Sequence, residues 1–335
     1  MINLEGKKNI LILRLGKIGD IIIASSAFSV WKKLFPENRL HLVTLYKNKE
    51  VLKYNKDLDK IYFIKNKPFL FLKLFGLRLL KFDLLIDLND DPSTTSTLIR
   101  KFVKPKSTAG FKFSDQNNLD ISLEQPSKKE THIIERLSQF IKKINPKFID
   151  ENLSPILYLG KTENDEAIHE LGSDVMDKKI IAINLSAGAS IRYWPEKNWI
   201  KLINMICKQS NVWNFIILSE KKDKKIRDII LQQIDKSRVI PTGYNSFQYY
   251  AAFIKNSDLV ITADTAAVHI ASAFNIPVVA IYPNYEWNFI SWQPLSDNFK
   301  AIRSKENNIS DVSVDIVYES FLNLVNEIRA NINEK

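Results

Sequence analysis

The chain has 335 residues, which is long for one hydrophobic core and predicts two domains. Its hydrophobic content of 45% is that of a globular protein, and its single cysteine, Cys207, excludes an internal disulfide and a multi-cysteine metal cluster and suits a reducing compartment. The net charge of +10 favours anionic partners, either nucleic acid, phosphorylated substrates or an acidic membrane surface.

The first half of the chain alternates apolar strands with amphipathic helices. We predict strands over residues 9–15, 41–45, 60–64, 83–88 and 107–111, and helices over 20–34, 93–102 and 132–144. The strands are apolar without alternation, which indicates a parallel sheet covered by helices on both faces. The pattern breaks over residues 145–159, where two prolines and mixed polar residues predict a linker.

A second alternating series follows the predicted linker. Strands are predicted over residues 179–185, 213–218, 238–240, 258–263 and 277–282, and helices over 195–208, 222–234, 247–255, 265–274 and 312–332. The chain therefore predicts two doubly wound α/β domains, 1–155 and 156–335, with the last helix packing on its own domain or back on the first. Two such domains place ligands in a cleft at the carboxyl ends of their strands.

The stretch "RLGKIGD", residues 14–20, joins the first predicted strand to the first predicted helix. Gly16 and Gly19 permit a tight turn or the close approach of a ligand. Their G-x-x-G spacing lacks the third glycine of a dinucleotide-binding fingerprint. Asp20 then has two interpretations: a helix N-cap that contributes about 1 kcal/mol, or a general base presented by a rigid strand–turn–helix unit.

The stretch "DLVITADTAAVHIASAFNIPVVAIYP", residues 258–283, contains a second strand-to-helix junction. Thr265 and His269 are four residues apart, so they share one face near the start of the predicted helix, where backbone N–H groups and the helix dipole favour an anion. Asp264 can cap or orient these groups, and Ala266 is small enough for close approach. The alternative interpretation is a capped core helix that contains a buried histidine.

The stretch "INLSAGASIRYWPEKNW", residues 183–199, runs from a strand through a loop of small residues to a Trp-Pro helix start. The loop, which contains Ser186 and Gly188, offers hydroxyls and backbone N–H groups. Arg192 offers a forked cation that suits phosphate. The alternative interpretation is a surface arginine beside a structural Trp-Pro corner.

Taken together and in this order, the three stretches resemble the heptosyltransferase family, the glycosyltransferase family 9 enzymes that use ADP-heptose to build the lipopolysaccharide inner core. The resemblance covers residues 8–285. It implies a GT-B fold, in which two Rossmann-like, doubly wound parallel-sheet domains face a cleft. It further implies that the N-terminal domain binds a lipid-linked acceptor and that the C-terminal domain binds the nucleotide sugar.

The resemblance also implies roles for particular residues. Asp20 matches the family's catalytic base, and the turn around it, Gly16, Lys17 and Gly19, is expected at the acceptor, where Lys17 can meet a carboxylate or phosphate. One displacement with one base inverts the anomeric centre. The predicted donor-binding residues, which share a place at the strand ends of the second domain, are Ser186, Gly188, Arg192, Glu220, Asp264, Thr265, Ala266 and His269; Glu220 is a candidate for the nucleoside.

Two positions depart from the family pattern. Arg192 stands where the family usually has a lysine, so the positive charge is kept. Ala266 replaces a frequent glycine, so the residue stays small. The loop expected after residue 283, with Trp287, Asn288 and Trp292, lacks an obvious family pattern, so a sugar other than heptose stays open.

No Asp-x-Asp motif with suitable placement suggests a divalent metal, and no cofactor is expected. The stretch "DLNDD", residues 87–91, is acidic but is interpreted as a solvated turn at a strand end. The helix start at Thr265, the loop amides of 186–190 and Arg192 are expected to stabilise the departing diphosphate instead.

One basic apolar segment, "KPFLFLKLFGLRLLKF" over residues 67–82, predicts either a core helix with a loop or a segment lying in a membrane interface. No run of the sequence approaches the length of a membrane-spanning helix, and the N-terminal apolar stretch is too short for a signal peptide. The expected location is cytoplasmic, with peripheral contact on the inner face of an anionic membrane. No nucleic-acid-binding signature is present, so nucleic acid is not an expected partner.

Two other functions remain open at this point. A nucleotide-dependent oxidoreductase or epimerase uses the same kind of domain, but this hypothesis predicts a complete dinucleotide fingerprint, which the chain lacks. A non-catalytic protein that binds sugar nucleotides or lipids would tolerate the loss of Asp20.

Overall fold

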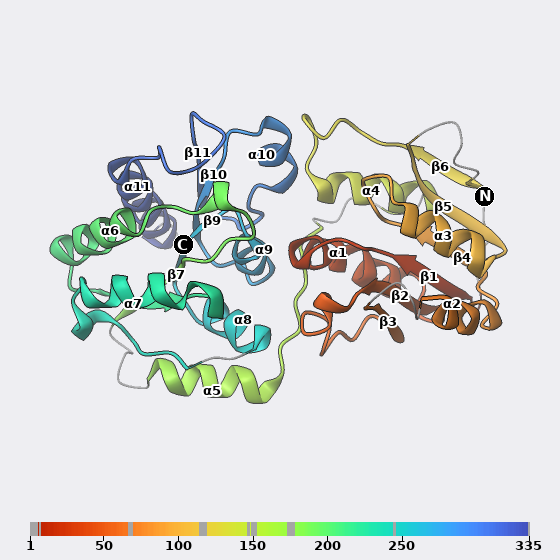
Figure 1. Ribbon diagram of the computed structural model, residues 1–335, viewed down its shortest axis with the longest axis horizontal. Coiled ribbons are helices and arrows are strands. Elements are labelled where there is room, and N and C mark those ends of the chain that lie inside the picture. The colour runs from red at the N-terminus through yellow and green to blue at the C-terminus, as the bar shows by residue number, and fades with distance from the viewer. Residues whose placement is uncertain are drawn as a thin grey trace. The chain divides into compact units, whose positions relative to one another are not determined.

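The computed structural model describes residues 6, 8–65, 70–113, 119–145, 148, 153–172, 178–243 and 246–333. The chain divides into two compact units, residues 1–158 and 159–335, next to the boundary expected between residues 155 and 156. Each unit is a parallel sheet with helices on both faces (Figure 1), which confirms the predicted α/β class. Part of the predicted linker, residues 146–147 and 149–152, lies outside the described residues.

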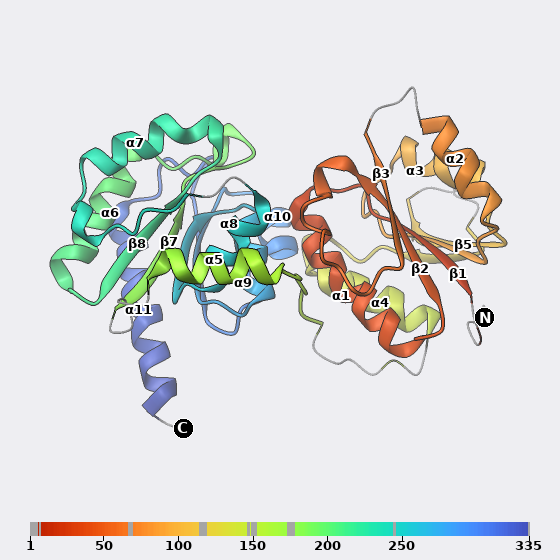
Figure 2. The same cartoon turned by 90° about the horizontal axis from the view of Figure 1, so that it is seen from below.

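The described part of the first unit holds a six-stranded sheet in the order β3-β2-β1-β4-β5-β6, the Rossmann order. Helices α1 and α4 pack together, as do α2 and α3, and the two pairs lie on opposite faces of the sheet (Figure 2). The elements are β1 (Asn9–Leu13), α1 (Ile18–Leu34), β2 (Arg39–Leu45), β3 (Lys60–Ile64), α2 (Leu70–Leu79), β4 (Leu84–Asp87), α3 (Thr94–Val103), β5 (Ser107–Lys112), β6 (Ile121–Glu124) and α4 (Ile133–Ile144).

The described part of the second unit holds a five-stranded sheet in the order β11-β10-β9-β7-β8. Val239 adds an isolated parallel bridge to Phe215 beyond β8, so the strand predicted over 238–240 is reduced to one paired residue. The elements are α5 (Lys161–Leu171), β7 (Lys179–Asn184), α6 (Glu196–Gln209), β8 (Trp213–Leu218), α7 (Lys224–Gln232), α8 (Phe247–Lys255), β9 (Leu259–Ala263), α9 (Ala266–Ala273), β10 (Val278–Tyr282), α10 (Glu286–Trp292), β11 (Phe299–Arg303) and α11 (Val314–Asn333).

The sequence patterns explain these elements. The central strands are buried along their length because helices cover both sides; Ile10 to Leu13 of β1 and all of β9 are examples. In the second unit one face of the sheet packs on Trp199, Ile206 and Phe321, which come from α6 and α11. The last helix therefore packs on its own unit, against α6, β10 and β11.

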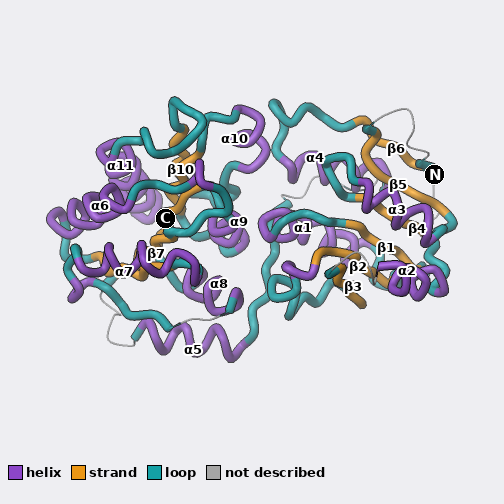
Figure 3. The backbone as a smooth tube through the Cα atoms, viewed as in Figure 1, coloured by secondary structure: helices purple, strands orange, loops and turns teal. Residues whose placement is uncertain are grey.

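Four described elements lie outside the predicted pattern: β6, α5, α10 and β11 (Figure 3). Both extra strands are at sheet edges, where β6 is only half-buried and β11 is mostly half-buried, so neither has the apolar run of a central strand. The helix α5 is highly charged and buries Ala167 and Leu171 as its apolar contacts. Trp287, Asn288 and Trp292 lie in helix α10, so the prediction that they lie in a loop is wrong; the side chain of Trp287 lies outside the described residues.

Candidate active site

The first candidate site is at the carboxyl ends of β1 and β4. The strand order of the first sheet reverses between these two strands, and such switch points are where open α/β sheets bind ligands. The turn after β1 leads to Asp20 on α1, and the loop after β4 contains Asn89 and Asp90. Two segments distant in sequence thus meet where chemistry is expected.

Asp20 lies in the first turn of α1, three residues after Lys17, which is the N-cap. Asp20 is therefore not the N-cap itself, but it takes part in capping as the N3 residue, whose side chain accepts the backbone N–H of the N-cap. Its Oδ2 accepts the backbone N–H of Lys17 at 2.9 Å, and its Oδ1 is 2.8 Å from Nη2 of Arg14. The carboxylate is 21% exposed, so it is oriented by the protein while remaining reachable from solvent. A carboxylate has about four lone-pair directions, so two contacts leave acceptor capacity for a substrate hydroxyl.

Gly16 is required by the position of Asp20. A Cβ on Gly16 would lie 2.4 Å from the Cβ and Cγ of Asp20, which is far inside van der Waals contact. Gly19, expected in the turn, instead lies inside the first turn of α1. Lys17 is exposed beside them. The structure thus brings the three predicted acceptor-side residues together with Asp20.

Arg14 is the buried centre of this site. Its side chain is 1% exposed, and Nη1 donates to Oδ1 of Asp90 at 2.7 Å and to the carbonyl oxygen of Leu88 at 2.5 Å. Burial by itself lowers the pKa of Arg14, but the Asp90 and Asp20 carboxylates outweigh it, so this pKa lies above its ordinary value. Arg14 thereby ties Asp20 to the loop after β4.

Asp90 is held by a second buried cation. Its Oδ2 is 3.4 Å from Nη2 of Arg136, whose side chain is fully buried, and 4.0 Å from Nζ of Lys128. Burial by itself raises the pKa of Asp90, but Arg14, Lys128 and Arg136 outweigh it, so this pKa lies below its ordinary value. The carboxylate is therefore an ionised anchor for Arg14.

The interpretation of residues 87–91 as a solvated turn is wrong for most of that stretch. Asp87, Asn89 and Asp90 are each less than 9% exposed. Asn89 accepts the backbone N–H of Leu15 at 2.8 Å and donates to Asp87 at 2.7 Å. Only Asp91 is exposed among these acids, and it pairs with Lys128. The apolar start of "DLLIDL" shows a strand, but the sequence does not show that its polar continuation folds inward onto Arg14.

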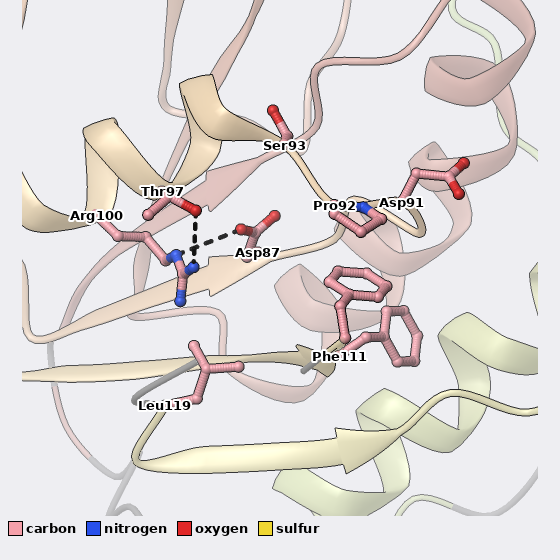
Figure 4. A pocket seen from close by; sticks show the side chains of 9 residues that line it. Asp87, Asp91, Pro92, Ser93, Thr97, Arg100, Phe111 and Leu119 are labelled. Carbon is pink, nitrogen blue, oxygen red and sulfur yellow. Dashed lines mark hydrogen bonds and ion pairs between the residues drawn. The ribbon is translucent and has the colours of Figure 1, made fainter. Parts of the chain in front are cut away.

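A cavity of about 280 Å³ adjoins this site on the far side of β4 (Figure 4). Part of its polar lining interacts within the protein: Nε of Arg100 lies 3.6 Å from Oδ2 of Asp87, and Nη2 of Arg100 donates to the Thr97 hydroxyl at 3.3 Å. Phe111, Phe113 and Leu119 form its apolar side. Asp20 is not among the residues that line this cavity.

The second candidate site is at the carboxyl ends of β7 and β9, between which the strand order of the second sheet reverses. Thr265 is the N-cap of α9, and its hydroxyl accepts the N–H of Ala267 at 3.2 Å. Asn184, at the end of β7, donates to Thr265 at 3.2 Å and to the carbonyl of Ser186 at 3.0 Å. Asn184 therefore joins the two predicted donor-binding segments, a role that was not foreseen.

Arg192 and Asp264 form an ion pair in this site. Nη2 of Arg192 is 3.3 Å from Oδ2 of Asp264, and Nη1 donates to the Asp264 carbonyl at 3.2 Å. Asn288 completes the cluster, because its Nδ2 donates to Oδ2 of Asp264 at 2.6 Å. Asp264 is 3% exposed and the Arg192 side chain is 26% exposed, so the arginine is the member of the pair that reaches solvent.

The other predicted donor-binding residues are spread around this pair. The Ser186 hydroxyl accepts the backbone N–H of Glu220 at 2.7 Å, which joins the loops after β7 and β8. Gly188 is exposed, and a Cβ there would meet nothing within 4 Å, so the fold itself does not require glycine. Glu220 is mostly exposed and pairs with Lys222. Ala266 is half-buried as the first residue of α9.

His269 is buried within the second unit. It is 5% exposed, and its ring packs edge-to-face on Trp292 of α10, with centroids 5.7 Å apart. This matches the interpretation of a buried helix histidine. The described residues include no group of three or more His, Cys, Asp or Glu side chains arranged to hold a metal ion.

Comparison with known proteins gives consistent results. Residues 75–320 match the model of glycosyltransferase family 9 (heptosyltransferase), so the segment of Asp20 lies outside the matched part. A putative lipopolysaccharide heptosyltransferase 4 of Escherichia coli is 26% identical over 321 residues, 91% of this chain and 83% of that protein.

Solved structures show the same fold. The glycosyltransferase family 9 protein of Veillonella parvula has a TM-score of 0.82 at 16% identity, over 96% of this chain and 97% of that one. The E. coli heptosyltransferase WaaC with ADP-2-deoxy-2-fluoro heptose has a TM-score of 0.72 at 13% identity, over 94% and 99%. The expected GT-B class is thereby confirmed.

Proposed function

This chain belongs to glycosyltransferase family 9, the heptosyltransferases, and from that premise we propose that it transfers heptose from ADP-heptose to the inner core of lipopolysaccharide or lipooligosaccharide. The chain is thus a transferase enzyme. The observation that supports the chemistry best is Asp20, held by Arg14 and the Lys17 amide at the switch point of the first sheet.

Asp20 acts as the general base in this proposal. Transfer needs a group that accepts the proton of the acceptor hydroxyl as its oxygen attacks the anomeric carbon. Arg14 and the Lys17 N–H fix the direction of the carboxylate, while its exposed fraction leaves room for a hydroxyl. A single displacement by the acceptor oxygen inverts the configuration of the anomeric carbon. Gly16, Lys17 and Gly19 border the place where the acceptor sugar binds.

The second unit binds the nucleotide sugar in this proposal. The diphosphate leaves with growing negative charge, which a preorganised cation and a helix N-terminus stabilise. Arg192 and the start of α9 at Thr265 supply both at the switch point of the second sheet. The bound donor analogue named for the E. coli WaaC structure supports an ADP-sugar as the donor. No metal is required in this scheme, because Arg192 and the helix supply the positive charge.

The acceptor is proposed to be a lipid-linked core oligosaccharide, as the heptosyltransferase names of the relatives suggest. None of the described helices combines the length and apolar character needed to span a membrane. We propose that the enzyme reaches its acceptor from the cytoplasmic side as a peripheral protein on the inner face of the cytoplasmic membrane.

Acceptor-dependent release of ADP tests the function. The protein is incubated with ADP-heptose and a core lipid that lacks heptose, with and without EDTA. We expect ADP to appear only when both substrates are present, at the same rate with EDTA. Strong inhibition by EDTA, reversed by added magnesium, would contradict the metal-independent scheme.

A donor panel separates the alternatives. ADP-heptose is compared with other nucleotide sugars and with UDP-N-acetylglucosamine in the absence of acceptor. Turnover of a different nucleotide sugar with the core acceptor would support a family 9 transferase and would show that the transferred sugar is not heptose. Conversion of a nucleotide sugar without acceptor would instead indicate an epimerase and contradict the proposed function.

A further inference from the structure

Helix α2 exposes large apolar side chains on the surface of the first unit. Leu79 is 66% exposed and Phe75 is 59% exposed, and no other large hydrophobic side chain in the described part of the chain is as exposed as these two. Leu80, directly after the helix, is 40% exposed. Phe75 and Leu79 are one helical turn apart, so they lie on the same face.

The opposite face of α2 is fixed by the fold. Leu77 is 2% exposed and belongs to the core cluster of Leu11, Leu13 and Phe82, and the helix packs beside α3 at the edge of the unit in Figures 1 and 2. The burial of Leu77 sets the rotation of the helix, which turns Phe75, Arg78 and Leu79 outward. Their exposure is therefore a consequence of how the helix is anchored. Residues 67–69 of the basic apolar segment lie outside the described residues.

The charge of the chain is concentrated in the unit that contains α2. Residues 1–158 have 28 Lys and Arg against 17 Asp and Glu, a net charge of +11, whereas residues 159–335 have 20 against 21. Arg78 and Lys81, which flank the exposed leucines, are themselves exposed. The first unit thus presents apolar side chains within a cationic surface.

We propose that the α2 face, defined as Phe75, Arg78, Leu79, Leu80 and Lys81, docks onto an anionic phospholipid bilayer. Large apolar side chains at a bilayer surface enter the boundary between headgroups and acyl chains, and nearby cations attract anionic headgroups. A protein partner with an acidic apolar surface is the competing occupant, but the net charge of +11 of residues 1–158 far exceeds the two cations of this face, which fits an extended anionic surface better. The biological use of this docking rests on the proposed function, because a lipid-linked acceptor lies in such a surface.

Vesicle sedimentation without donor or acceptor tests the docking. Vesicles of phosphatidylglycerol and phosphatidylcholine are compared with phosphatidylcholine alone. We expect binding to the anionic vesicles that weakens with added salt, and at least about tenfold weaker binding of Phe75→Ser/Leu79→Ser. Arg78→Gln should weaken binding by a smaller factor. Since all three side chains are exposed, the variants should fold.

The matched control is Ile229→Ser/Ile316→Ser, which removes two apolar side chains of the second unit that are 39% and 48% exposed. It should bind vesicles like the wild type. The proposal would be overturned if both double variants lost vesicle binding equally, or if the wild type did not bind anionic vesicles. Loss of self-association in sedimentation velocity, with vesicle binding unchanged, would assign the face to a second copy instead.

Turnover of a water-soluble, deacylated core acceptor separates this proposal from the proposed function. The Phe75→Ser/Leu79→Ser variant should turn over that acceptor at the wild-type rate. A wild type that is active on the soluble acceptor but does not bind vesicles would refute the docking and leave the transferase function in place.

Discussion

At the scale of single residues, the proposed role of Asp20 as a general base depends on the contacts of its carboxylate. The carboxylate of Asp20 accepts hydrogen bonds from the buried side chain of Arg14 and from the backbone N–H of Lys17. Both hydrogen bonds hold the carboxylate in one orientation. Orientation of a general base matters because misplacement by about 1 Å can cost about 10²-fold in rate. Residues that touch Asp20 without touching substrate should therefore alter turnover more than binding.

Gly16→Ala tests this expectation. The new Cβ would lie 2.4 Å from the Asp20 side chain, so the carboxylate must shift. We expect kcat to fall by about 10²-fold while the affinity for ADP stays within twofold, because the proposed donor-binding residues belong to the second unit. Steady-state kinetics and calorimetric titration with ADP measure the two quantities.

The control for that substitution is Gly243→Ala, since a Cβ at Gly243 meets nothing within 4 Å. It should leave kcat unchanged. Wild-type turnover of Gly16→Ala would show that the position of the Asp20 carboxylate is not critical, which would count against Asp20 as the general base.

Asp90→Asn tests the buried anchor of Arg14 through the pH dependence of stability. The pKa of Asp90 lies below its ordinary value of 3.8, so its ionised form stabilises the fold above that pH, and the contribution is lost as the pH falls through the lowered folded pKa. At pH 7 the substitution should cost about 3–5 kcal/mol, as expected when one partner of a buried ion pair is removed.

The difference between the wild type and Asp90→Asn should shrink as the pH is lowered from 5 toward about 2, because only the wild type then loses its carboxylate charge. Urea unfolding at several pH values measures this difference. A constant gap across that range would show that Asp90 does not stabilise the fold through its charge.

At the scale of elements, the sequence predicts the central strands and most helices well because their patterns are local. Buried apolar runs such as "LVITA" of β9 and capped amphipathic stretches such as the one after Ser246 are recognisable from the local sequence alone. The edge strands β6 and β11 and the charged helix α5 form through tertiary contacts that a local pattern does not show. The same holds for the site. The sequence singles out Asp20 and Arg192, but it does not show that Arg14 pairs with Asp90, 76 residues away, or that Arg192 pairs with Asp264, 72 residues away.

Thr265→Val tests the start of α9. It removes the hydroxyl that caps the helix and accepts from Asn184, so stability should fall by about 1–2 kcal/mol and ADP should bind several-fold more weakly. Thr265→Ser should restore both. Thermal unfolding and calorimetric titration with ADP are the measurements.

Ser246→Ala is the matched control, because Ser246 caps α8 through the N–H of Tyr249 in a part of the unit with no predicted donor residue. It should cost comparable stability and leave ADP binding intact. Unchanged ADP binding in Thr265→Val would remove the start of α9 from the donor site.

At the scale of the whole molecule, the two units share one architecture but differ in charge. A net charge of +11 belongs to residues 1–158, and the second unit is nearly neutral. The overall value of +10 hides this asymmetry, which becomes visible only once the boundary between the units is known. The excess positive charge, which would attract the protein to an anionic surface, therefore belongs to the unit that contains Asp20 and α2.

The most direct test of the account is the turnover of Asp20→Asn with ADP-heptose and a core lipid that lacks heptose, measured beside its affinity for ADP. The substitution keeps the shape of the side chain and removes its capacity to accept a proton. We predict a loss of about 10²–10⁴-fold in kcat with ADP affinity unchanged. Turnover within a few-fold of the wild type would contradict the assignment of Asp20 as the base.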